Sequence, residues 1–114
     1  IQPGNTLKEI DRATHVFGLA LPGGIVGTTG IGGLTLGGGI GYLSRKAGLT
    51  IDHLIEAELI LANGELIKAN KNNHPDLFWA IRGGGGNFGV VVSFTFQLID
   101  LKTVYAGPMF WPME

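Results

Sequence analysis

The sequence LALPGGIVGTTGIGGLTLGGGIGYLS, at residues 19–44, contains no charged residue and is interrupted repeatedly by glycine. Glycine contributes 20 of the 114 residues of the chain, whereas its usual share is about 7%. A backbone without side chains lets its N–H groups approach a ligand closely, and the Leu, Ile and Val residues between the glycines keep the surroundings apolar. The stretch therefore predicts a binding surface of backbone amides, suited to a pyrophosphate joined to a flat apolar ring.

Side chains around these glycines add to this prediction. Thr28, Thr29 and Thr35 are candidate hydroxyl donors, and a helix expected over residues 36–46 would offer its positive N-terminal end to an anion. The alternative is that the glycines only allow tight packing of turns, because a glycine motif alone is weak evidence for a site. The residues by themselves leave both interpretations open.

Two familiar nucleotide motifs do not apply. A Walker A loop needs Gly-Lys followed by Ser or Thr, and no glycine of this chain is followed by Lys. The sequence GGGNFG at residues 84–89 matches G-x-G-x-x-G, but a Rossmann motif follows a strand and opens a helix. Here the motif follows an expected helix and enters an expected strand, so the order argues against a Rossmann site.

The N-terminal residues predict an amphipathic helix. Thr6 and Glu9 have the spacing of a capping box, in which each residue satisfies a backbone N–H group of the other. Apolar residues follow at positions 7, 10, 13, 16 and 17, and Gly18 is a suitable left-handed end for the helix.

The second half of the chain predicts a hairpin, a helix and a strand. The runs 56–62 and 65–69 flank Asn63-Gly64, a pair typical of a type I′ turn. Pro75 is expected to start a short helix that continues through Ile81. Residues 90–99 are rich in β-branched and aromatic side chains and predict a buried strand.

This order of elements predicts an α+β fold, with a mixed, largely antiparallel sheet and flanking helices, and not a repeating βαβ unit. Trp79, at helical spacing from Pro75, is expected in the core or at an interface. The aromatic stretch 105–111 has a strand-like composition. Because the chain opens at Ile1 without Met, we expect it to be a piece of a longer protein.

The composition limits the kinds of partner that the chain is expected to bind. The 8 Lys and Arg against 9 Asp and Glu give a net charge of -1, which favours neither nucleic acid nor an anionic membrane. There is no cysteine, and His15, His53 and His74 have no ligand spacing, so no metal site is expected. No apolar run is long enough to span a membrane and no signal peptide is recognisable, so a soluble protein of the cytoplasm is the default expectation.

Several motifs closely resemble the berberine-bridge-enzyme-like branch of FAD-linked oxidases, and the resemblance covers nearly the whole chain. The matching stretches are PGG at 22–24, TGIGGLTLGGGIG at 29–41, SRK at 44–46, GLTID at 48–52 and DLFWAIRGGGGNFGVV at 76–91.

The resemblance implies the two-lobe FAD-binding fold of the vanillyl-alcohol-oxidase group, also called the PCMH type. Residues 1–101 would form most of the second lobe, and residues 102–114 would begin a substrate domain. Family members oxidise an alcohol, sugar or amine by hydride transfer to the flavin, which dioxygen usually reoxidises. A small-molecule substrate would therefore bind through a domain that this chain lacks.

The resemblance also implies which residues contact the cofactor FAD. Residues 29–41 would follow the pyrophosphate and the isoalloxazine ring, and the backbone at Val90 and Val91 would meet the adenine end. The expected cofactor-binding residues are Gly27, Thr28, Thr29, Gly30, Gly32, Gly33, Gly37, Gly38, Gly39, Gly41, Asp52, Val90 and Val91.

The sequence departs from the family at several points. The flavin-linking histidine of the family would lie upstream of Ile1, and Val26 stands where many members carry a second flavin-linking cysteine. His53 stands where Asn is usual, and no catalytic residue is identifiable. The other hypothesis is a ligand-free structural module without activity of its own. In either case we expect self-association, with Phe94, Phe96, Phe110 and Trp111 as uncovered apolar surface.

Overall fold

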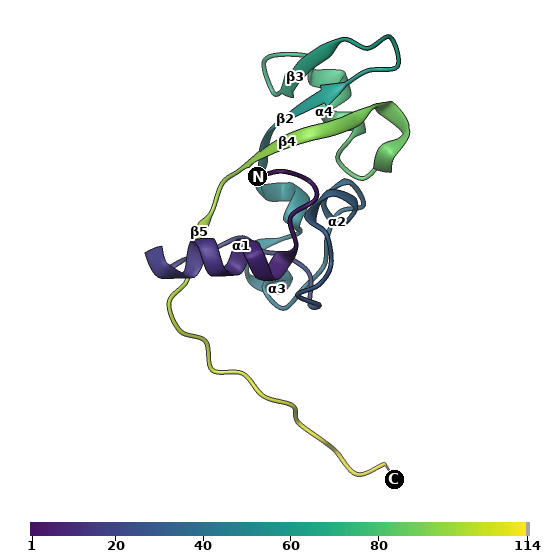
Figure 1. The fold of residues 1–114 in the computed structure, drawn as a ribbon. Coiled ribbons are helices and arrows are strands. Elements are labelled where there is room, and N and C mark those ends of the chain that lie inside the picture. Colours follow the sequence, from purple (N-terminus) through teal and green to yellow (C-terminus); the bar gives the residue numbers. More distant parts are fainter. Residues whose placement is uncertain (114) are drawn as a thin grey trace.

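The computed structural model describes residues 1–113, in which a small sheet lies at one end of the body and α1 at the other (Figure 1). Helix α1 (Leu7–Thr14) begins with the predicted capping box. The backbone N–H of Thr6 donates to the Glu9 carboxylate at 2.7 Å, and this hydrogen bond lowers the pKa of Glu9. A short 3₁₀ turn, η1 (His15–Phe17), continues the helix, and Gly18 ends it at φ 68°.

The amphipathic prediction for this helix is only partly confirmed. Leu7 and Ile10 are buried against Leu21 and Ile31. Val16 and Phe17, expected on the same apolar face, are 66% and 76% exposed. The change to 3₁₀ geometry after Thr14 alters the helical period, so that these two side chains leave the face that packs on the body.

The predicted antiparallel sheet is confirmed. It contains β2 (Leu54–Ile60), β3 (Leu66–Asn70) and β4 (Val90–Phe96) in the order β3-β2-β4. A second pair joins β1 (Leu19–Ala20) to β5 (Ile99–Asp100), also antiparallel. The chain is therefore of the α+β class, and the strands belong to two small sheets.

The hairpin between β2 and β3 has a different turn from the predicted type I′. Gly64 has φ 84°, but Asn63 is not among the residues with positive φ. The N–H of Gly64 donates to the carbonyl of Leu61 at 2.9 Å, and Leu61 N–H donates to the carbonyl of Glu65, also at 2.9 Å. These bonds define a type I turn followed by a left-handed glycine bulge, which needs positive φ at the glycine alone.

One face of the three-stranded sheet packs against α4 (Pro75–Ala80). Phe78 and Ile81 lie in the resulting core together with Phe94, which is 2% exposed. The expectation that Phe94 forms uncovered apolar surface is therefore wrong, because Phe94 belongs to the core. Trp79, the neighbour of Phe78, is 78% exposed and does not lie in this core, so of the two places expected for it only an interface stays a prediction.

The glycine-rich stretch forms two short helices where one was expected over residues 36–46. These are α2 (Ile31–Leu36) and α3 (Ser44–Ala47). Between them Gly38 and Gly39 have φ values of 110° and 78°, which no continuous right-handed helix allows. Their carbonyls accept from the N–H groups of Ile51 and Thr50, so that η2 (Thr50–His53) fixes the break.

The final strands also differ from expectation. Val90 is 68% exposed and Val91 is 7% exposed, so β4 has one covered face and is not fully buried. It ends at Phe96 and not at Ile99. Residues 101–113 have no regular structure and lead away from the body (Figure 1), so the strand expected over 105–111 is absent from the described part of the chain. A strand needs a neighbour for its N–H and C=O groups, and this stretch has none there.

Candidate cofactor site

The start of α2 lies where the sequence predicted an anion site, but its first amides are already bonded within the chain. The N–H of Ile31 donates to the carbonyl of Asn5 at 2.9 Å, and that of Gly32 donates to the carbonyl of Pro3 at 3.0 Å. In the preceding loop, the carbonyl of Gly27 accepts from the backbone N–H of Lys8, and the carbonyl of Thr29 accepts from that of Leu7. The N-terminal segment thus holds this loop in place and takes up the amides at the end of the helix.

A strip of exposed backbone remains in this loop and along helix α2, which follows it. Thr28, Gly30, Gly33 and Gly37 are exposed. A β-carbon added at Gly33 would meet no other atom within 4 Å, so this backbone faces open space. Because none of the glycines carries a side chain, a flat group can lie directly on this strip.

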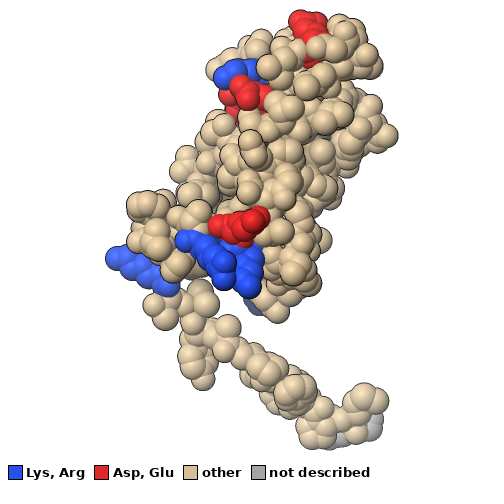
Figure 2. Space-filling view, viewed as in Figure 1, with Lys and Arg blue, Asp and Glu red and all other residues tan. Residues whose placement is uncertain are grey.

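The apolar character that the sequence predicted is present beside this strip. Ile25 and Val26 are 58% and 59% exposed, and the whole of residues 19–44 lacks charge. Figure 2 shows charged side chains gathered toward the sheet end and toward α1, with an uncharged surface between them. An apolar surface with a few threonine hydroxyls and bare backbone suits an aromatic ring system with polar edges.

Four of the predicted cofactor-binding residues are buried in the described chain, and each has a packing explanation. Gly32 lies against Pro3, and Gly39 lies against Thr50. Gly38 is buried near Leu49, and Val91 belongs to the core of the sheet. Gly41 is half-buried, and a β-carbon there would collide with the carbonyl of Gly23. Gly27 and Thr29 are also half-buried.

Asp52 lies apart from the exposed strip, within η2. Its Oδ2 accepts from the N–H of Leu49 at 2.8 Å, and its Oδ1 is 3.7 Å from the guanidinium of Arg82. Arg82 in turn lies over the ring of Phe78, with 5.6 Å to the ring centroid. The carboxylate of Asp52 therefore joins η2 to the end of α4.

Val90 lies at a second opening, at the start of β4. A pocket of about 250 Å³ is found here, between the hairpin tip and the 3₁₀ turn η3 (Gly85–Phe88). The predicted order of GGGNFG between a helix and a strand is confirmed, since η3 follows α4 and precedes β4. The pocket is lined by Ile60, Leu61, Ala62, Gly86, Asn87, Phe88, Gly89 and Val90.

His53 makes contacts that the sequence did not predict. Its Nε2 lies 2.8 Å from the carbonyl of Ala47, and its Nδ1 lies 3.2 Å from the carbonyl of Gln97. The ring therefore connects the end of α3 to the segment after β4. Gln97 is 44 residues from His53 in the sequence, so no local signal could have identified this contact.

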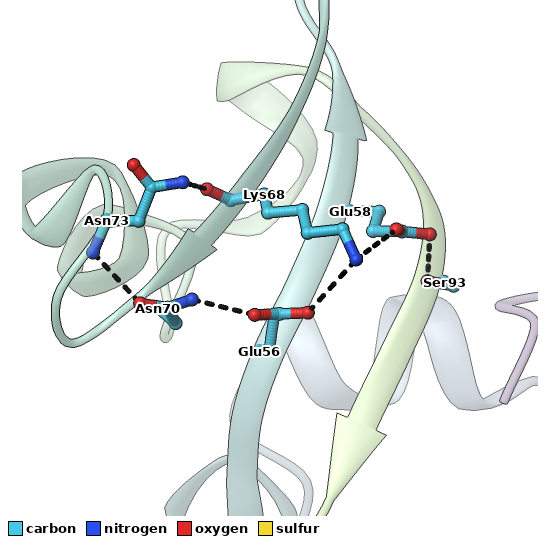
Figure 3. Close-up of polar contacts among 6 residues, drawn as sticks. All are labelled: Glu56, Glu58, Lys68, Asn70, Asn73 and Ser93. Atoms are coloured by element: carbon cyan, nitrogen blue, oxygen red, sulfur yellow. Dashed lines mark hydrogen bonds and ion pairs between the residues drawn. The ribbon is translucent and has the colours of Figure 1, made fainter.

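The outer face of the sheet carries a polar network that spans all three strands (Figure 3). Lys68 lies 3.0 Å from Glu58 and 3.8 Å from Glu56, and the hydroxyl of Ser93 donates to Glu58 at 2.7 Å. The Ser93 hydrogen bond and then Lys68 lower the pKa of Glu58, while the hydrogen bond and charge of Glu58 raise the pKa of Lys68. These groups satisfy one another and form no reactive centre.

Residues 1–113 contain no cluster of side chains that would bind a metal ion. Within residues 1–113 there is no cluster of three or more His, Asp or Glu that would hold a metal ion. In the same residues no helix has the length and hydropathy needed to cross a membrane. The exposed backbone strip of residues 27–37 and the pocket beside Val90 form the candidate site. Open glycines, apolar neighbours and threonine hydroxyls fit a flavin dinucleotide.

Comparison with known proteins identifies the family of the chain. Residues 1–70 match the family model described as FAD binding domain. An FAD-linked oxidoreductase of Dictyostelium discoideum is 49% identical over 112 residues, which are 98% of this chain and 25% of the relative. Berberine bridge enzyme-like 3 of Arabidopsis thaliana is 46% identical over 110 residues, which are 92% of this chain and 20% of the relative.

A solved structure shows the same fold. Xylooligosaccharide oxidase from Myceliophthora thermophila superposes with a TM-score of 0.85 at 42% identity, over 88% of this chain and 21% of the oxidase. The chain thus spans about a quarter of the length of the first of these relatives. The predicted resemblance, fold class and cofactor are confirmed: the chain belongs to the FAD binding domain family of FAD-linked oxidoreductases.

Proposed function

We propose that this chain forms one wall of the FAD site in an enzyme that oxidises an alcohol, a sugar or an amine. The solved relative that acts on a xylooligosaccharide supports a sugar or a similar alcohol as the substrate class. When bound, FAD supplies the hydride acceptor, and dioxygen is the proposed final acceptor of the electrons. The residues of this chain bind and orient the cofactor.

The observation that carries the proposal is the uncharged strip of exposed backbone. Thr28 and Gly30 are exposed in the loop before α2, Gly33 is exposed on α2, and the loop also carries exposed, apolar Ile25 and Val26. In this arrangement the strip lies against the isoalloxazine ring and the pyrophosphate. The absence of side chains permits close contact, and the threonine hydroxyls donate to the polar edge of the ligand.

The remaining predicted residues take three roles in this proposal. Val90 and the pocket beside it receive the adenine end, because the pocket is open and lined mainly by apolar atoms. Gly32, Gly39 and Gly41 hold the glycine-rich segment in its shape, since their surroundings leave no room for a side chain, and Gly38 does so through its positive φ. Val91 belongs to the core of the sheet. Asp52 positions η2 through Leu49 and Arg82.

We also propose a division of the chain near the end of β5. Residues 1–101 contain every helix and strand of the described chain and form the cofactor-binding lobe. Residues 102–114 begin a substrate domain, and in residues 102–113 the side chains are exposed. Tyr105 and Phe110, for example, have fully or largely exposed rings. The choice of substrate would then depend on residues outside this chain.

Substitution of Gly33 by Val in the full-length enzyme tests the proposed strip. A β-carbon at Gly33 meets no atom outside its own helix within 4 Å, so the side chain projects into the space where the ring would lie. We expect the purified variant to fold normally and to lose most of its flavin, measured by absorbance after denaturation. Gly4→Val is the matched control, because Gly4 is also open but lies outside the strip. Equal flavin content in the two variants would contradict the proposal.

A further inference from the structure

At the tip of the β2-β3 hairpin an asparagine is followed by glycine, the residue that most favours deamidation of the asparagine before it. Asn63 is followed by Gly64, and no other asparagine in the 114-residue sequence is followed by glycine. Both residues are exposed to solvent. An added β-carbon at Gly64 would meet nothing within 4 Å, so no neighbouring group crowds this residue.

The side chain of Asn63 is held over its own turn. Its Oδ1 accepts from the N–H of Glu65 at 3.0 Å, and its Nδ2 donates to the Glu65 carboxylate at 3.3 Å. This local bond folds the carboxamide back along the chain, past the nitrogen of the intervening Gly64. We propose that Asn63 is a site of spontaneous deamidation, with the backbone nitrogen of Gly64 as nucleophile.

The step needs only water as co-reactant. The Gly64 nitrogen loses its proton to solvent and bonds to Cγ of Asn63, the bond from Cγ to Nδ2 breaks, and Nδ2 leaves as ammonia with a proton from water. Water then opens the five-membered succinimide at either carbonyl and yields aspartate or isoaspartate, with no oxidation or reduction. The N–H of Glu65 donates to Oδ1, where negative charge develops.

One contact of the folded hairpin opposes the reaction. The N–H of Gly64 donates to the carbonyl of Leu61 at 2.9 Å, so this bond must open before the nitrogen can attack. Opening of an exposed turn is a low-energy local fluctuation compared with global unfolding. The reaction therefore proceeds in the folded protein, at a rate set by opening of the turn.

The product changes the hairpin. Isoaspartate adds one carbon to the main chain and a carboxylate beside Glu65. The turn with its glycine bulge fixes the register of Ile60 opposite Leu66, so a longer loop weakens this pairing. Ala62 in the same loop lines the pocket beside Val90, and the change reaches that pocket too.

Peptide mapping of the chain tests the proposal after storage in mildly alkaline buffer. We expect the peptide with Asn63 to gain the mass difference between an amide and an acid several-fold faster than the peptides with Asn5, Asn70, Asn72, Asn73 and Asn87. Labelling by isoaspartyl methyltransferase should locate part of the product there. Asn63→Gln keeps the carboxamide but requires a larger ring, and this control should remain unchanged. An intact Asn63, under conditions that convert a synthetic peptide of residues 59–68, would overturn the proposal.

Discussion

Thr35 is fully buried on α2, and its hydroxyl has no hydrogen-bond partner within residues 1–113. A buried polar group without a partner destabilises the folded state by about 1–3 kcal/mol. We therefore expect Thr35→Val, which keeps the shape of the side chain, to raise the free energy of unfolding by about 1 kcal/mol. Urea unfolding measures the change.

Thr50 is the control for this prediction. It is also fully buried, but its hydroxyl donates to the carbonyl of Gly39 at 3.4 Å. Thr50→Val should therefore lower the free energy of unfolding, and the two valine variants should differ in sign. If Thr35→Val also destabilises the chain, its hydroxyl has a partner in solution.

Gly39 shows how a motif glycine can act through packing. Its φ is 78°, and a β-carbon there would lie 2.6 Å from Cβ of Thr50. We expect Gly39→Ala to lower the free energy of unfolding by more than about 2 kcal/mol, from backbone strain and collision together. Chemical unfolding of the isolated chain measures this effect without any cofactor.

Gly64→Ala separates the effect of backbone strain from the effect of steric collision. Gly64 has a similar φ of 84° but an open position, so only the strain applies there. Its cost should be about 1 kcal/mol. Equal effects at Gly39 and Gly64 would mean that contact with Thr50 does not contribute.

At the scale of elements, the polar network on the sheet links three strands and predicts that the free energy of unfolding depends on pH. The hydroxyl of Ser93 on β4 and Lys68 on β3 lower the pKa of Glu58 on β2. A carboxylate whose pKa is lower in the folded state stabilises the protein above its unfolded pKa, and this contribution disappears as the pH falls through the folded pKa.

We therefore expect Ser93→Ala to destabilise the sheet at neutral pH and to have little effect once Glu58 is protonated. Urea unfolding at about pH 7 and about pH 3 compares the two states of the carboxylate. The control is Thr95→Ala, which changes an exposed hydroxyl on the same strand that has no recorded hydrogen bond to Glu58. If the stability difference between the original chain and Ser93→Ala grew toward acid pH, Ser93 would not act through the carboxylate of Glu58.

At the scale of the whole molecule, the exposed C-terminal segment predicts self-association of the isolated chain. Tyr105, Phe110 and Trp111 are exposed to 107%, 89% and 79%. Contiguous apolar surface of this kind tends to be covered by another molecule. We expect the average mass from light scattering to rise with concentration, and the double variant Phe110→Ser, Trp111→Ser to suppress the rise. A chain that stays monomeric would disprove the expectation.

Signals within a few residues of one another were sufficient for several elements. Thr6 with Glu9 identified the start of α1, and Pro75 identified the start of α4. Asn63-Gly64 identified the hairpin but not its turn type, because type I with a bulge and type I′ share the glycine. The glycine-rich stretch indicated a cofactor surface without showing which of its glycines are exposed.

The sequence by itself therefore determined the α+β class, the helix starts, the hairpin position and, through its motifs, the cofactor. Only the tertiary structure decided which glycines are open. Gly33 faces open space, whereas Gly39 packs on Thr50. The tertiary structure also decided that Phe78 is buried and Trp79 is exposed. The physical reason is that capping and turn formation depend on neighbours in the chain, whereas exposure depends on contacts between segments that lie far apart in it.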